Sequence, residues 1–312
     1  MTSQFTAEAG TQGEFVRQPN HFRDRITADG TSGYPTESGR YVLYVSLACP
    51  WAHRSVIVRR LLGLEDALAL RVVDPLRDGR GWRFTLDEGD VDPVTGASYV
   101  MELYQRSDPT FEGRATVPFV WDSATERIVT NDYPQITLDL STQWSALHRA
   151  DAPQLYPEHL RSEIDEVAQT NFHAVNNGVY RAGFATSQQA YESAYDALFT
   201  RFDALEQVLG SQRYLVGGQL TDADVRLYTT LARFDAAYHG HFKCNQRKLS
   251  EYDALWAYAR DLWQTPGFGD TTDLGHVKAH YYGTHEAINP TGIIPKGPVT
   301  DWSAPHGREA LP

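Results

Sequence analysis

The sequence predicts a two-part fold, an α/β domain followed by an all-α domain. A strand, a helix and a second strand follow one another between residues 41 and 73. A hairpin pattern lies between residues 116 and 130. Apolar residues then recur at three-to-four-residue spacing within residues 158–270, which is the period of amphipathic helices. A chain of 312 residues is long enough to bury a core in each of two domains.

The composition disfavours several classes of protein. The formal net charge of −12 disfavours nucleic acid and anionic membranes as partners, because binding to either needs a concentrated basic surface. Aromatic residues make up 12% of the chain, which argues against disorder. The sequence has no apolar stretch approaching the roughly 18 residues of a membrane span, and residues 1–20 lack the regions of a signal peptide. We therefore expect a cytoplasmic protein that binds a small molecule.

Residues 1–38 are predicted to form an arm that wraps the body or is mobile. This segment is polar, rich in Gly, Thr and Ser, and has no sustained periodicity. We expect no chemistry in it.

The α/β domain is predicted over residues 39–147. Residues 41–45 have strand composition, residues 51–62 fit an amphipathic helix ended by Gly63, and residues 68–73 fit a second strand. A strand-helix-strand unit of this kind implies that its two strands are parallel.

Cys49 lies between the first strand and the helix, and Pro50 suits the first helical turn. The amide groups and the positive dipole end of a helix N-terminus stabilise a negatively charged sulfur. Cys49 is therefore the candidate nucleophile, and the alternative is a buried cysteine that acts as a small apolar group. Without a secretory signal, Cys49 and Cys244 are both expected to be reduced thiols, with Cys244 in a structural role.

A long insertion, residues 74–113, follows the second strand. It exceeds an ordinary connection in length, which favours a functional role. Residues 116–121 and 127–130 then fit the two strands of a hairpin. Pro118 lies at the start of the first of these strands, and a cis Val117–Pro118 bond is one alternative there. A proline at this position would expose the backbone of Val117 for pairing with an extended ligand.

The all-α domain is predicted over residues 158–270. Its periodic segments are residues 160–176, 187–209 and 222–237. Thr221, with Asp224 three positions later, forms an acidic variant of the capping box, to which we assign a folding role. Residues 271–312 form a tail rich in proline and glycine, whose aromatic residues predict that it packs back onto the body.

Four runs of sequence closely resemble the glutathionyl-hydroquinone reductases, the xi class of the cytosolic glutathione transferases. The runs are residues 49–54 (CPWAHR), 176–184 (NNGVYRAGF), 241–245 (HFKCN) and 288–295 (INPTGIIP). They occur in the family's order, and the similarity covers almost the whole chain beyond residue 20. The resemblance implies the cytosolic glutathione transferase fold, with a thioredoxin-like N-terminal domain and an all-α C-terminal domain. It also implies a homodimer.

The resemblance implies thiol-dependent reduction of glutathionyl-hydroquinones. In that family a cysteine attacks the sulfur of the aryl thioether, releases the hydroquinone and remains as a mixed disulfide that a second thiol molecule resolves. By motif match this cysteine is Cys49, in agreement with its reading as a thiolate. Tyr180 and Tyr281 or Tyr282 match tyrosines that the family places over the substrate, where a phenol can donate a proton. For any single tyrosine the alternative is core packing.

The resemblance also implies a thiol site. Trp82 and Arg114 match residues that flank glutathione, and the backbone of Val117 matches the one that pairs with its cysteinyl part. Arg114 could clamp a carboxylate, with a solvated surface arginine as the alternative. Asp132 and Tyr133 stand where the family has Glu-Ser, so the glutamyl end meets a shorter carboxylate and a bulky ring. The co-substrate is expected to be glutathione or another low-molecular-weight thiol, such as mycothiol or γ-glutamylcysteine.

Two other functions remain open at this point. One is thiol oxidoreduction like that of the omega-class transferases, in which Cys49 reduces mixed disulfides or dehydroascorbate. The other is a non-catalytic binding protein with the transferase fold, against which the retained cysteine and tyrosine motifs argue. Conjugating activity is disfavoured, because a cysteine at this position forms mixed disulfides where conjugating enzymes use a hydroxyl. We expect no metal, since the histidine spacings match no zinc motif, and no nucleotide, since no glycine-rich phosphate loop is found.

Overall fold

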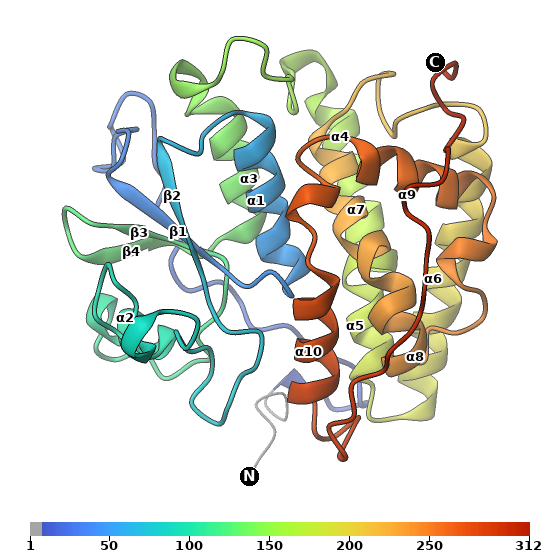
Figure 1. Cartoon of the computed structure of the whole chain (residues 1–312), viewed down its shortest axis with the longest axis horizontal. Coiled ribbons are helices and arrows are strands. Elements are labelled where there is room, and N and C mark those ends of the chain that lie inside the picture. The colour runs from blue at the N-terminus through green and yellow to red at the C-terminus, as the bar shows by residue number, and fades with distance from the viewer. Residues whose placement is uncertain (1–7) are drawn as a thin grey trace. The chain divides into compact units, whose positions relative to one another are not determined.

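The computed structural model describes residues 8–312, so that residues 1–7 of the predicted arm lie outside the described part. The chain divides into two compact units (Figure 1). The first unit contains residues 18–153 and 275–280. The second contains the rest of the described chain. The first unit is built on a sheet and the second is helical, which confirms the predicted fold class.

The sheet of the first unit has the strand order β2-β1-β3-β4 within the described residues. β1 (Tyr41–Val45) pairs parallel with β2 (Leu68–Val72) and antiparallel with β3 (Phe119–Asp122). β4 (Arg127–Thr130) pairs antiparallel with β3. The predicted parallel pair and the predicted hairpin are therefore confirmed. All five residues of β1 are buried, as expected of a central strand that is covered on both faces.

Helices and the insertion cover the two faces of this sheet. α1 (Pro50–Leu61) and α3 (Tyr133–Thr142) pack side by side (Figure 1). Alternate residues of β1, Val42 and Tyr44, belong to an apolar cluster that includes buried side chains of α2 (Val100–Ser107). Because α2 lies inside the predicted insertion, part of that segment belongs to the hydrophobic core. Its Val100, Leu103 and Tyr104 have helical spacing that could have revealed the helix from the sequence.

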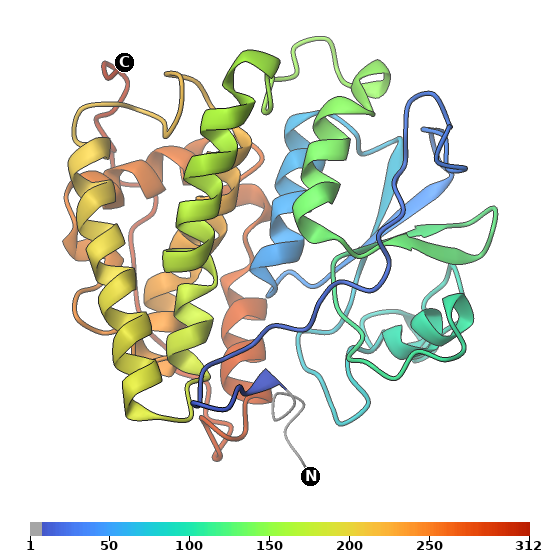
Figure 2. The ribbon, with the colours of Figure 1, turned by 180° about the vertical axis from the view of Figure 1, so that it is seen from behind.

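The second unit is built mainly of α-helices, and α6 lies alongside α5 (Figure 2). Its helices, including the one shared with the first unit, are α4 (Arg161–Asn171), α5 (Gly178–Gly183), α6 (Gln188–Leu209), α7 (Asp222–Arg233), α8 (His239–His241), α9 (Ala254–Gln264) and α10 (Leu274–Thr284). Single π-helical segments, Phe172–Asn176 and Phe234–Tyr238, continue α4 and α7, so each predicted helix there changes its pitch near its end. Short 3-10 helices occupy Glu88–Asp90, Ser145–Leu147, Glu158–Leu160, Leu249–Glu251 and Gly269–Thr271. Within residues 8–312, no helix combines the length and the apolar character that crossing a membrane requires.

The helix α10 lies in the segment predicted as a tail. The sequence predicts packing of this segment but no helix, and its Gly275 and Gly283 lower the helical signal. Gly275–His280 belongs to the first unit, and the residues from Tyr281 onward belong to the second.

The predicted capping box at the start of α7 is present. Asp224 is completely buried, and its carboxylate accepts hydrogen bonds from the backbone N–H of Thr221 at 2.9 Å and of Leu215 at 2.9 Å. The hydroxyl of Tyr258 donates to the same carboxylate at 2.8 Å. Burial raises the pKa of Asp224 above its ordinary value. This side chain therefore joins α7 to α9 and to the loop before α7.

Replacing Asp224 with alanine is expected to lower the free energy of unfolding by about 2–4 kcal/mol, because it removes a helix cap and leaves buried donors without an acceptor. Equilibrium denaturant unfolding measures the effect. Asp253→Ala is the matched control, since Asp253 is the exposed N-cap of α9 and its side chain makes no capping hydrogen bond within the described residues. The control should change stability by less than about 0.5 kcal/mol. Equal small losses in both variants would contradict the assignment.

Candidate active site

Cys49 is the N-cap residue of α1, and its side chain lies against the loop that precedes β3. Its backbone is extended, with φ −77° and ψ 118°. The Sγ atom lies 3.5 Å from the carbonyl oxygen of Val117, and the half-buried side chain packs against the apolar cluster of the first unit. Within residues 8–312, the sulfur makes no helix-capping hydrogen bond. It therefore lies at the N-terminus of α1, with the Val117 carbonyl oxygen as its hydrogen-bond acceptor.

The loop that carries Val117 is held by hydrogen bonds from Tyr104 and Asn131. The Val117–Pro118 bond is cis, the alternative considered from the sequence. The hydroxyl of Tyr104 donates to the carbonyl oxygen of Thr116 at 2.8 Å. The amide of Asn131, which is buried, donates to the Tyr104 hydroxyl at 3.1 Å and to the Thr116 hydroxyl at 3.2 Å. These contacts hold the backbone next to Cys49 in one position.

The N-terminal arm supports two segments of the candidate site. The side-chain amide of Gln18 pairs with both backbone groups of Arg114: Arg114 N donates to Oε1 at 2.9 Å, and Nε2 donates to Arg114 O at 3.2 Å. Phe22 N donates to Oδ1 of Asn131 at 2.9 Å, and Asn131 N donates back to Phe22 O at 3.0 Å. The arm therefore holds residues of the site, a role that the sequence did not predict.

Asp132, the N-cap of α3, has its carboxylate paired with the arm. Nδ2 of Asn20 donates to Oδ1 at 3.0 Å, and Nε of Arg23 lies 3.7 Å from Oδ2. Both carboxylate oxygens of Asp132 therefore already contact side chains of the arm.

Tyr133 packs against the first turn of α1. Its ring lies 4.9 Å from that of Trp51, and the guanidinium of Arg54 lies 4.6 Å from the Trp51 ring and 5.9 Å from the Tyr133 ring. Arg54 is buried, so its guanidinium contacts both rings in a low-dielectric setting. Tyr133 thereby lies close to the helix end that carries Cys49.

Trp82 is a core residue of the first unit and belongs to the same apolar cluster as Val117. Its ring stacks on that of His280 at 4.9 Å and 20°, and the guanidinium of Arg77 lies 5.1 Å from the ring centre. Nδ1 of His280 lies 2.7 Å from the carbonyl oxygen of Pro75. Trp82 and Val117 thus share one apolar cluster, and Cys49 packs against it.

The second unit brings two of the predicted tyrosines, Tyr180 and Tyr281, together with Tyr238 through their hydroxyl groups. The Tyr180 and Tyr281 hydroxyl oxygens lie 2.5 Å apart, and those of Tyr238 and Tyr281 lie 2.9 Å apart. Burial raises the pKa of Tyr281 and of Tyr238 well above the ordinary value of tyrosine, so both phenols keep their protons at neutral pH. Tyr238 was not singled out from the sequence, although it lies three residues before the His241 run.

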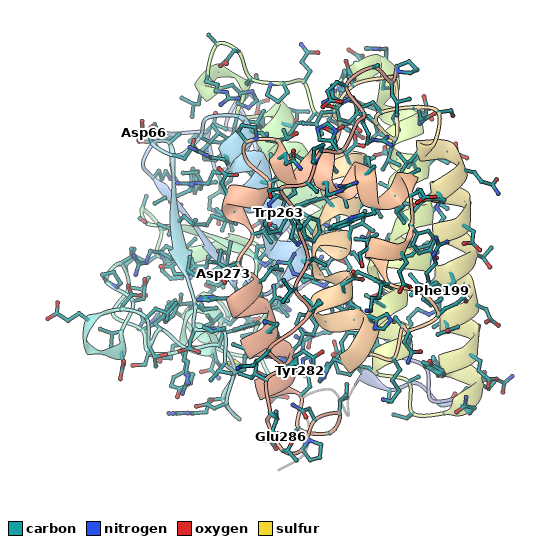
Figure 3. The ribbon with its side chains drawn as sticks, turned by 45° about the vertical axis from the view of Figure 1, so that its right-hand side comes forward. Asp66, Phe199, Trp263, Asp273, Tyr282 and Glu286 are labelled. Carbon is teal, nitrogen blue, oxygen red and sulfur yellow. The ribbon has the colours of Figure 1, made fainter. Side chains whose placement is uncertain are left out.

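The two candidate tyrosines of α10 have different surroundings. Tyr281 is the one that bonds to Tyr180. Tyr282, near the end of the helix in Figure 3, is half-buried with its ring 4.8 Å from that of His241. Its carbonyl oxygen accepts a hydrogen bond from Nδ2 of Asn289 at 2.7 Å. Of these two tyrosines, it is Tyr281 whose hydroxyl group is hydrogen-bonded to that of Tyr180 within the described residues.

Arm residues also contact Tyr180. The guanidinium of Arg17 lies 4.9 Å above the Tyr180 ring and donates to Oδ1 of Asn177 at 3.0 and 3.1 Å. The ring of Phe15 stacks on Tyr180 with a centroid distance of 6.3 Å. Asn177 and Tyr180 belong to the same sequence run, so the arm fixes that run from one side.

A pair of buried histidines lies beside the tyrosines. Nε2 of His241 is 3.1 Å from Nδ1 of His285. Burial, with a smaller contribution from Lys243, lowers the pKa of His241 to about 4. Within the part of the chain that the structure describes, metal-ligating side chains form no group of three or more.

Comparisons with known proteins place these features in a family context. Residues 188–261 match the family model described as the glutathione S-transferase C-terminal domain. The glutathionyl-hydroquinone reductase YqjG of Escherichia coli is 45% identical over 96% of this chain and 93% of its own length. The glutathione-bound structure of YqjG has a TM-score of 0.89 and covers 93% of this chain and 96% of that one.

Two other solved structures are similar. A glutathione transferase from Gordonia bronchialis is 60% identical, with a TM-score of 0.91, and covers 92% of this chain and 90% of that chain. The xi glutathione S-transferase of Phanerochaete chrysosporium is 43% identical, with a TM-score of 0.91, and covers 96% and 98% respectively.

The neutral state of His241 predicts a pH dependence of stability. Unfolded histidine takes up a proton near pH 6.5, whereas the folded protein resists protonating His241 until about pH 4. The unfolded state therefore binds more protons between these values, and the free energy of unfolding falls as the pH is lowered through this window. Denaturant unfolding from pH 7 to 4.5 should show a smaller fall in His241→Asn than in the wild type. Identical pH slopes would contradict the prediction.

Proposed function

Because the chain belongs to the xi class of glutathione transferases, the family of the glutathionyl-hydroquinone reductases, we propose that it removes glutathionyl groups from hydroquinones through Cys49. The chain is an enzyme of this superfamily and, in general terms, a thiol-dependent reductase. The main support for the proposed role of Cys49 is the placement of its sulfur at the N-terminus of α1, 3.5 Å from the carbonyl oxygen of Val117.

In the proposed reaction the Cys49 thiolate attacks the sulfur of the aryl thioether. A sulfur–sulfur bond forms, the bond from sulfur to the aromatic carbon breaks, and its electron pair stays on that carbon, which takes up a proton. The products are free hydroquinone and a mixed disulfide on Cys49. A second thiol molecule then attacks the mixed disulfide, which restores the cysteine and releases the disulfide of the small thiol. The cycle begins and ends with the free cysteine at the N-terminus of α1.

The proton and the orientation of the aromatic substrate are assigned to the phenols. Tyr180 and Tyr281 are the proposed contacts, because both match the tyrosines of the family and their hydroxyl groups are hydrogen-bonded to each other. A positioned phenol can donate to a hydroquinone oxygen or to the ring. Tyr282 stays a candidate for packing against the substrate.

Glutathione is the proposed co-substrate, as the glutathione-bound relative from E. coli supports. The Val117 backbone would pair with its cysteinyl part, and Trp82 and Arg114 would flank it. Asp132 would accept the γ-glutamyl ammonium, while Tyr133 lies next to it on α3. The shorter carboxylate and the larger ring keep mycothiol and γ-glutamylcysteine as alternatives that an assay must separate. By family resemblance, the enzyme is proposed to act as a cytoplasmic homodimer.

Cys49→Ser is expected to lower kcat/KM for release of hydroquinone from glutathionyl-menadiol by about 10³-fold or more, because the nucleophile is lost. Product release is followed chromatographically. Cys244→Ala is the matched control, since Cys244 is buried and burial raises the pKa of its thiol strongly. The control should retain the wild-type rate. Turnover retained by Cys49→Ser would overturn the mechanism, and wild-type activity confined to simple mixed disulfides would favour the omega-like function.

Asp132→Asn is expected to raise KM about 10-fold for glutathione as the resolving thiol, since it removes the charge that pairs with the γ-glutamyl ammonium while keeping the size of the side chain. Mycothiol lacks that ammonium and serves as the internal comparison, while γ-glutamylcysteine carries it. The rates with all three thiols are measured for wild type and variant. An equal effect of the substitution on all three thiols would contradict the assigned role of Asp132.

A further inference from the structure

The carboxylate of Asp132 lies at the start of α3 but does not cap that helix. An aspartate at an N-cap ordinarily accepts a hydrogen bond from the backbone N–H two or three positions later. Asp132 is the N-cap of α3, and within the described residues its side chain makes no capping hydrogen bond. Pro134 at the second helical position has no N–H, and the N–H of Gln135 donates to the carbonyl oxygen of Asp132 at 2.9 Å. Contacts outside α3 therefore orient this carboxylate.

The arm supplies these contacts, and it treats the two carboxylate oxygens differently. Nδ2 of Asn20 donates to Oδ1 at 3.0 Å. Nε of Arg23 lies 3.7 Å from Oδ2, which is longer than a hydrogen bond, and the Arg23 side chain is 67% exposed. Within residues 8–312, Oδ2 of Asp132 accepts no hydrogen bond, and the side chain keeps 22% of its surface exposed. One oxygen is thus fixed by the arm, and the other is held only by a weak surface ion pair.

Backbone pairing determines the position of Asn20. Phe22 exchanges hydrogen bonds with Asn131, and Arg23 forms an antiparallel bridge with Thr130. Because the two segments run antiparallel, residues that precede Phe22 lie beside residues that follow Asn131. The amide of Asn20 is therefore placed next to Asp132 by the same pairing that fixes the loop, and both residues belong to the first unit.

We propose that Asn20 is a positioning residue of the thiol site, which fixes Oδ1 of Asp132 and thereby orients Oδ2 toward the ammonium group of a γ-glutamyl thiol. The inference rests on the proposed function, in which Asp132 accepts that ammonium. Asn20 itself does not touch the thiol in this proposal. Without its amide, the carboxylate can turn to the N–H groups at the start of α3, and the thiol must reorder it on binding. A carboxylate that is already ordered binds more tightly, because this cost is removed from the binding step.

Asn20→Ala tests the proposal, with the dissociation constant of reduced glutathione measured by titration calorimetry. The constant is expected to rise about 3–5-fold, the effect of one lost hydrogen bond that orders an acceptor. The probe that isolates the ammonium is glutaryl-cysteinylglycine, which is glutathione without its amino group. It should bind the wild type more weakly than glutathione does, and Asn20→Ala should not change its binding. Adding Asn20→Ala to Asp132→Asn should cause no further loss of glutathione affinity, because Asn20 acts through the Asp132 charge.

Arg25→Gln is the matched control. Arg25 comes from the same arm and pairs with Asp139 of the same helix, its Nε lying 3.1 Å from both carboxylate oxygens. The substitution weakens the contact between the arm and α3 without touching Asp132. It should leave the dissociation constants of both ligands unchanged.

The outcomes separate the proposals. A loss of glutathione affinity in Asn20→Ala alone, with the binding of the analogue intact, supports the positioning role. Unchanged or tighter glutathione binding, or an equal loss for both ligands or in both variants, overturns it. If the wild type binds glutathione no better than the analogue, the proposed contact at Asp132 fails and the role of Asn20 with it. Binding needs no turnover, so absence of hydroquinone release would overturn the proposed reaction alone.

Discussion

The arrangement at Cys49 depends on the hydrogen bonds of one buried side-chain amide, that of Asn131. Its oxygen accepts from the arm at Phe22, and its nitrogen donates to Tyr104 of α2 and to Thr116 of the loop before β3. One residue thus joins the arm, the insertion and the loop whose next carbonyl lies against the sulfur. A buried amide that lost any of these partners would leave polar groups without hydrogen bonds, so the loop has little freedom to move.

The second unit uses the same constraint with different groups. Three buried hydroxyl groups, those of Tyr180, Tyr238 and Tyr281, hydrogen-bond to one another, as buried polar groups require. The π-helical segment that ends at Tyr238 and the helix that carries Tyr281 belong to parts of the sequence 43 residues apart. The contact between these hydroxyl groups is therefore a property of the packed interior, and no single sequence motif contains it.

This distinction explains what the sequence predicted and what it did not. The strand before Cys49, the helix after it and the capping box at Thr221 are set by neighbouring residues, and they were predicted closely. The arm contacts, the pairing of Tyr238 with Tyr281 and the role of Asn131 arise between residues far apart in the chain, where periodicity carries no information. The helix α10 was hidden by its glycines and by the composition of the tail around it.

The departure from the family pattern that the resemblance implies lies at Asp132 and Tyr133. Tyr133, in place of a small hydroxyl residue, packs on Trp51 at the first turn of α1, and Asp132 is paired with the arm through Asn20. Neither residue takes part in the contact between the Cys49 sulfur and the carbonyl oxygen of Val117. In physical terms, the groups expected to recognise the far end of the thiol are separate from those that act at the sulfur. A change of co-substrate could therefore arise in this fold without a change of chemistry, because it would need new contacts only where the carboxylate and the ring have already changed.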